Sequence, residues 1–166
     1  GKKDFCCIVT GGRRYGSGLI DIFDVRMTKG LPDKQIDLLL DVYSEFSPGL
    51  IGAEENIFKN LLRPNIEKQG RERGLYPPVQ AVYQTQNKIT RVLKIQPPIE
   101  AKTIRFARHL LKTCPEYFRQ WDDFPTGDHD DGPDATEGLV QLLEKNVIGS
   151  MAGFSLGTKE SLWKVG

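Results

Sequence analysis

The chain has 166 residues, a formal net charge of +1 and 39% hydrophobic residues, which suits one globular domain with a buried core. A net charge this close to zero excludes a globally basic nucleic-acid-binding protein, so any such surface must be local. No apolar run approaches the ~20 residues that span a bilayer, and no signal-peptide pattern opens the sequence, so we expect no membrane partner.

The N-terminal residues predict an antiparallel hairpin. Residues 5–9 are strand formers, Gly11-Gly12 signals a turn, and residues 19–27 form a second strand after a loop longer than two residues. The first strand contains Cys6 and Cys7, where a buried thiol is the commoner case. With Cys114 they make an odd count without metal-ligand spacing, which favours a reducing compartment, by default the cytoplasm, and argues against zinc.

Helices and strands alternate after the hairpin. A helix should begin near Pro32 and end near Ser47, and a second should continue to Gln69 with Pro64 bending or interrupting it. Short apolar strands are expected at residues 50–53 and 79–83, and strands that follow helices indicate parallel crossovers. The sequence therefore predicts an α/β fold with a mixed sheet flanked by helices.

The C-terminal half is less regular. The cationic stretch 85–93 fits a helix or a turn, and residues 103–106 fit a short strand or the start of a helix. Further helices are expected at 116–121 and 133–146; Pro133 would be the first residue of the last helix, with Asp131 or Gly132 as its N-cap. We expect residues 1–148 to form the domain and residues 149–166 to form a C-terminal extension.

Carboxylates occur where a functional site would be expected. Glu54 follows the strand at 50–53, on the sheet edge where open α/β folds bind ligands. Asp130, Asp131 and Asp134 gather at the start of the last helix, and grouped acids without nearby bases imply a cation. Mg²⁺ and Mn²⁺ prefer oxygen ligands, and two ions about 3.5–4 Å apart can promote phosphodiester hydrolysis. The structural alternative is that these acids interact with helix dipoles.

Other polar residues have two readings each. Asp4 is either a ligand or an acid flanking the first strand, and His129 is either a proton shuttle or an exposed capping residue. Asn87, Lys88 and Arg91 suit phosphate contacts, because Lys88 and Arg91 share one face if the segment is helical. A solvated helix face explains the same pattern.

Taken in order, these pieces resemble the C-terminal nuclease domain of the large terminase subunit of tailed bacteriophages and prophages. The resemblance extends from Gly1 to about Lys145, and five motifs carry it: Lys3-Asp4-Phe5, residues 52–58, residues 87–92, Pro97-Pro98-Ile99-Glu100 and residues 124–135. It implies an RNase H-like fold with a mixed five-stranded sheet. It also implies an endonuclease that cuts concatemeric double-stranded DNA with two Mg²⁺ or Mn²⁺ ions.

The resemblance assigns roles residue by residue. Glu54, Asp131 and Asp134 match the catalytic metal-binding acids, and Asp130 matches less closely. Asn56, in the same E-x-N pattern as Glu54, is a candidate DNA contact. The family's first metal-binding Asp lies in a strand that we expect upstream of Gly1. We expect an ATPase domain on the N-terminal side of that strand. The sequence itself contains no G-x-x-x-x-G-K-[S/T] motif.

The resemblance also implies partners and a location. The partners would be double-stranded DNA, the small terminase subunit and the portal protein, and the location would be the bacterial host cytoplasm rather than the mature virion. The alternative is a catalytically incomplete RNase H-like module that binds DNA or a packaging partner. A third option is another enzyme of the same fold, such as a Holliday-junction resolvase or a transposase.

Overall fold

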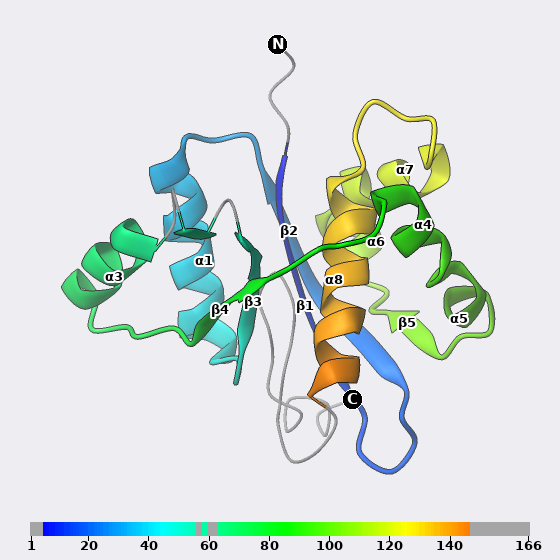
Figure 1. The fold of residues 1–166 in the computed structure, drawn as a ribbon, viewed down its shortest axis with the longest axis horizontal. Helices are drawn as coiled ribbons and strands as arrows, with labels where there is room; N and C mark the ends of the chain where they lie inside the picture. Colours follow the sequence, from blue (N-terminus) through cyan, green and yellow to red (C-terminus); the bar gives the residue numbers. More distant parts are fainter. Residues whose placement is uncertain (1–4, 56–57, 60–62, 147–166) are drawn as a thin grey trace.

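The computed structural model describes residues 5–55, 58–59 and 63–146, and their strands form two sheets (Figure 1). The strands are β1 (Cys6–Arg13), β2 (Ile20–Thr28), β3 (Ile51–Glu54), β4 (Val79–Val82) and β5 (Ile104–Phe106). The helices are α1 (Pro32–Phe46), α3 (Arg63–Glu72), α4 (Lys88–Leu93), α5 (Gln96–Glu100), α6 (Leu110–Thr113), α7 (Pro115–Asp123) and α8 (Asp131–Lys145). One sheet has the order β1-β2-β5 and the other pairs β3 with β4.

Strand directions confirm the predicted α/β class with a mixed sheet. β1 and β2 are antiparallel, whereas β2–β5 and β3–β4 are parallel pairs. Of the segments whose structure the sequence left open, residues 88–93 are helical and residues 104–106 are a strand. None of the helices in the described ranges is long and apolar enough to cross a membrane. The expected extension at residues 149–166 lies outside the described residues.

The prediction that Gly11-Gly12 is a turn is wrong, because β1 continues through both residues. The β1–β2 register shifts between Thr10 and Gly11. A Cβ atom on Gly11 would lie 2.6 Å from the Asp21 carbonyl oxygen and 2.8 Å from Leu139 Cδ2. Gly11 therefore permits close packing of the bulged strand against α8. The hairpin loop follows at residues 14–19.

Helices cover both faces of the strands. Ile8 of β1 and Ile51 of β3 pack in one cluster with Ile36 and Leu40 of α1. Val9, which alternation points to the opposite face, packs in a second cluster with residues of α7 and α8 such as Tyr117 and Leu139. α8 also contacts both β1 and β3. α1 and α8 therefore each pack against strands of both sheets. In Figure 1, α8 crosses in front of the strands.

A buried carboxylate fastens β5 to the hairpin. Asp21 of β2 is only 6% exposed, and two arginines donate to it. Arg105 of β5 approaches Asp21 Oδ1 at 2.7 Å, and Arg14 of the hairpin loop approaches Oδ2 at 3.1 Å. Two cations compensate the desolvation of this carboxylate.

α8 begins earlier than predicted. Asp130 is its N-cap and Asp131 its first residue, so Pro133 is the third helical residue. Pro133 is tolerated because the first turn has no intrahelical partners for its N–H groups. A hydrogen bond from α7 stabilises the start of α8: the Gln120 side-chain oxygen accepts the Gly132 N–H at 2.8 Å.

Candidate functional site

The N-terminus of α8 directs one of its acids toward the start of β1. Asp131 Oδ2 accepts the backbone N–H of Phe5 at 3.3 Å. Burial, and to a smaller extent the nearby Asp131 carboxylate, together raise the pKa of the Cys6 thiol to about 11. Asp131 therefore lies against the first strand.

His129 lies beside Asp131 but is not an exposed cap. Its ring makes an edge contact with Phe5, with ring centroids 5.1 Å apart. It is half-buried and lines a cavity of about 320 Å³ with residues that include Phe5, Lys29 and Glu116. The N-cap position belongs to Asp130. The exposed-cap interpretation is therefore wrong, whereas the proton-shuttle role stays a prediction.

Two further acids at the start of α8, Asp130 and Asp134, pair with α4. Lys88 Nζ lies 3.1 Å from Asp130 Oδ1 and 3.9 Å from Asp134 Oδ2. The Arg91 guanidinium lies 3.0 Å from Asp134 Oδ1 and also bonds to Glu137. Burial alone would lower the pKa of Lys88, but Asp134 and Asp130 outweigh it, so this pKa is raised. The two cations of α4 therefore offset most, but not all, of the charge of the three carboxylates that they contact.

Local sequence explains why α4 presents its cations to α8. Asn87 caps the helix, because its side-chain oxygen accepts the N–H groups of Ile89 and Thr90 at 2.9 and 3.4 Å. Lys88 and Arg91 then lie three residues apart on one face. Asn87, predicted to contact DNA, therefore has a structural role here that the motif alone did not reveal.

Glu137 is a site residue that the sequence analysis missed. It is 7% exposed and its partner Arg91 is 8% exposed, so the pair is buried. Burial raises the pKa of Glu137, although Arg91 acts in the opposite direction. The signal in the sequence was its position three residues after Asp134, which places both acids on the α4 side of the helix.

The prediction that the acids of α8 lack nearby bases is wrong. Lys88 and Arg91 are the balancing bases, and their charges are directed at the carboxylates of α8. Within the described ranges, no group of three or more His, Cys, Asp or Glu side chains could hold a metal ion. The predicted ligand Asp4 and the predicted DNA contact Asn56 lie outside those ranges.

Glu54 lies where the sequence predicted it, at the carboxyl end of β3, and it is exposed. The carboxyl end of β3 and the N-terminus of α8 lie on the same side of the molecule, the upper side in Figure 1, and α8 contacts β3. The oxygen donors of Glu54 and Asp131 suit a hard divalent cation. Two carboxylates are fewer than a complete ligand set, so an ion here would need further donors.

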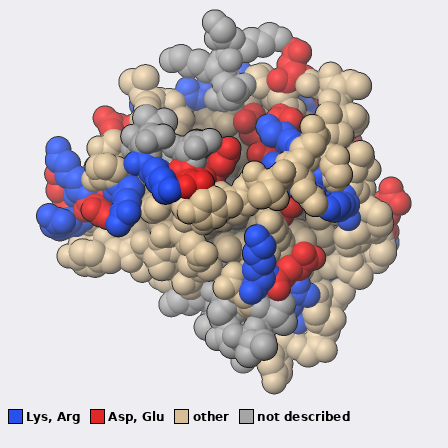
Figure 2. Space-filling model, in the orientation of Figure 1, with Lys and Arg blue, Asp and Glu red and all other residues tan. Residues whose placement is uncertain are grey.

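Charges of both signs share the surface around this end of the molecule. Figure 2 shows acidic and basic side chains intermingled over the described part of the face in view, without a continuous basic band. Contacts to a nucleic-acid backbone on this face would therefore be few and local.

No protein-family model matches the sequence, and no curated protein matches it significantly. The candidate site therefore rests on the geometry of Glu54, the acids of α8 and the cations of α4.

Proposed function

We propose that the chain is the divalent-metal-dependent endonuclease domain of a phage or prophage terminase large subunit, acting on double-stranded DNA. The observation that carries the proposal is the placement of two acids on the same side of the molecule, at the carboxyl end of a parallel strand and at the start of α8. Glu54 ends a parallel strand, and Asp131 begins the helix that packs on both β3 and β1. Carboxylates at such positions are suited to catalysis at a phosphodiester.

The coverage of both sheets by the same two helices supports an RNase H-like fold within this proposal. The sheet of such a fold is continuous, whereas here β1 and β3 belong to two separate sheets. α1 and α8 nevertheless cover both of them. A further strand between β1 and β3 would join the two sheets into one sheet of six strands.

Each residue has a stated part in the proposed reaction. Glu54 and Asp131 would hold Mg²⁺ or Mn²⁺, with Asp4 as a further donor. The bound ions would supply an activated water and stabilise the leaving oxygen. The Phe5 N–H orients Asp131, while Lys88 and Arg91 position Asp130 and Asp134. The ATPase domain, small subunit and portal partners, and the host-cytoplasm location, belong to this proposal too.

Nicking of supercoiled plasmid in Mn²⁺ tests the proposal. We expect activity that EDTA removes and that Glu54→Gln or Asp131→Asn each lowers by at least about 100-fold, a size typical of losing a catalytic group. Asp122→Asn, an exposed acid on α7, is the matched control and should cut normally. Folded Glu54→Gln and Asp131→Asn proteins that cut like the control would refute the site.

The ion pairs favour one second candidate, a catalytically incomplete module that binds DNA or a packaging partner. Asp130 and Asp134 already have Lys88 and Arg91 as cationic partners, which reduces their need for a metal ion. Calorimetric titration with Mn²⁺ separates the two functions. Binding that Glu54→Gln abolishes favours the nuclease, and absence of binding favours the module.

A further inference from the structure

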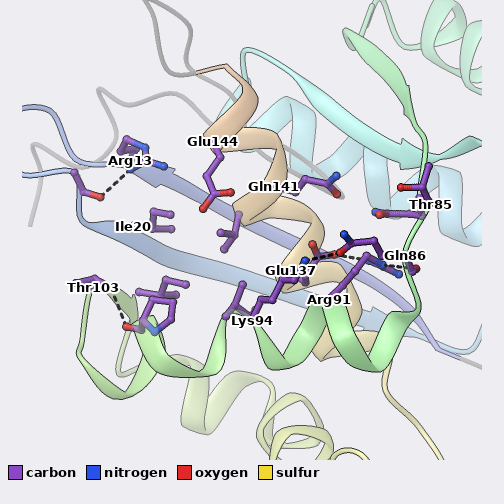
Figure 3. A pocket seen from close by; sticks show the side chains of 16 residues that line it. Arg13, Ile20, Thr85, Gln86, Arg91, Lys94, Thr103, Glu137, Gln141 and Glu144 are labelled. Carbon is purple, nitrogen blue, oxygen red and sulfur yellow. Dashed lines mark hydrogen bonds and ion pairs between the residues drawn. The ribbon is translucent and has the colours of Figure 1, made fainter.

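A cavity lies away from Glu54 and Asp131, beside the C-terminal half of α8. It measures about 650 Å³, and its walls come from α8, from α4 and α5, from the hairpin and from the segment that follows β4 (Figure 3). Its apolar lining includes Ile20, Ile95, Ile104 and Val140. This volume is in the range of small-molecule sites.

Three side chains that line this cavity have buried polar atoms without a partner. These atoms are Arg13 Nε, Gln84 Oε1 and Gln141 Oε1, for which the described residues supply no hydrogen bond. Figure 3 shows Gln141 extending from α8 toward the segment that carries Thr85 and Gln86. Buried polar groups in native proteins nearly always have partners, so three around one cavity indicate that a ligand supplies them.

The charges around the cavity favour an anion. Arg13 donates to the Gly18 carbonyl oxygen at 3.2 Å and has no carboxylate partner among the described residues. Lys94 Nζ donates to the neutral Gln86 side chain at 2.6 Å. Arg91 and Glu137 neutralise each other, which leaves Glu144 as the acid facing these two cations. The lining is therefore net positive.

We propose that this cavity binds a nucleotide. The base would lie against Ile20, Ile104 and Val140, its edge would bond to the amides of Gln84 and Gln141, and the phosphate would bind Arg13. Glutamine amides and arginine are groups that pair with base edges and phosphates. A fatty acid would leave both amides unpaired, and inorganic phosphate would leave the apolar surface unused.

The nucleotide can come from two sources, a free mononucleotide or the end of a single DNA strand. The proposal does not rest on the endonuclease activity, because neither Glu54 nor Asp131 lines the cavity. Binding measured in EDTA therefore tests this cavity alone. A protein that cuts DNA without binding nucleotides would refute the cavity proposal only, and the converse would refute the nuclease only.

Calorimetric titration tests the proposal. The titrants are the four deoxynucleoside monophosphates, inorganic phosphate and a short single-stranded oligonucleotide. We expect Gln141→Leu and Gln84→Leu each to weaken nucleotide binding about tenfold or more, the effect of losing a hydrogen bond in a desolvated site. Gln80→Leu, on the exposed face of β4, should bind normally. Preference for the oligonucleotide would identify a strand end as the source.

Thermal unfolding of the same variants completes the test. Replacing an unpaired buried amide with an apolar side chain of similar size should leave stability unchanged or raised, so lost binding in a stable Gln141→Leu protein marks a ligand contact. The proposal is overturned if neither nucleotide nor oligonucleotide binds at millimolar concentration, if Gln141→Leu and Gln84→Leu both bind normally, or if inorganic phosphate binds as tightly as the nucleotides.

Discussion

Asp131 and Asp134 lie three residues apart on α8 but have different surroundings. Asp131 accepts the backbone N–H of Phe5, just before β1. Asp134 instead forms ion pairs with Lys88 and Arg91 of α4. A carboxylate held by a backbone amide keeps its charge available to a metal ion, and one held by an arginine is largely neutralised. The difference shows that neighbouring acids on one helix can have different partners and therefore different chemical roles.

Removal of the ion pair between Arg91 of α4 and Glu137 of α8 should have the largest effect on stability. Arg91→Met leaves Glu137 buried without its cation, and we expect the free energy of unfolding to fall by about 3 kcal/mol, as for other broken buried pairs. Chemical denaturation measures it. The double variant Arg91→Met/Glu137→Leu should recover most of the loss, because no buried charge remains. A loss below about 1 kcal/mol in the single variant would show that the pair is not buried in solution.

Removing the charge of Asp131 should have an intermediate effect, on the chemistry of β1. The pKa of Cys6 is raised to about 11 by burial and by Asp131, so the reactive thiolate is scarce at pH 9. Asp131→Asn lowers this pKa, and alkylation of Cys6 by iodoacetamide should accelerate severalfold. Tandem mass spectrometry distinguishes Cys6 from Cys7.

Asp134→Asn is the control for that experiment, because Asp134 is not among the groups that shift the pKa of Cys6. Its alkylation rate should match the parent protein. Equal acceleration by both variants would show that the two acids share one environment, contrary to the comparison above.

Removal of the ion pair between Lys88 of α4 and Asp130 should have the smallest effect on stability. The side chains of Lys88 and Asp130 are 43% and 37% exposed, and exposed pairs contribute little. We expect Lys88→Met to reduce the free energy of unfolding by less than about 1 kcal/mol. Denaturation beside Arg91→Met makes the comparison direct, and a loss equal to that of Arg91→Met would contradict it.

Local patterns predicted most elements because each pattern has a local cause. The helix from Pro32 to Phe46 has a proline at its start and a buried apolar stripe, and the alternation of β1 places Ile8 and Val9 on opposite faces. Gly11-Gly12 misled because the sequence cannot distinguish a glycine that turns the chain from one that admits a neighbouring helix. That distinction depends on Leu139, 128 positions later.

The candidate site was predictable only in part for the same reason. Strand-end placement identified Glu54, and the crowding of acids identified the start of α8. Which bases oppose those acids depends on how α4 packs against α8, which neither segment encodes alone. Glu137 escaped notice because an acid within an apolar run looks like a solvated position until Arg91 lies beside it.

The carboxylate of Asp21 links the stability of the hairpin loop to that of β5, which are distant in the sequence. It binds Arg14 of the hairpin loop and Arg105 of β5, and β5 carries Ile104 in the cavity wall. When β5 detaches, Asp21 keeps only one cation in a poorly solvated position, so the loop loses stability as well. Amide protons of the loop and of β5 should therefore exchange through one shared opening event. An opening of the cavity on this side would then involve the hairpin loop and β5 together, since both contribute to its wall.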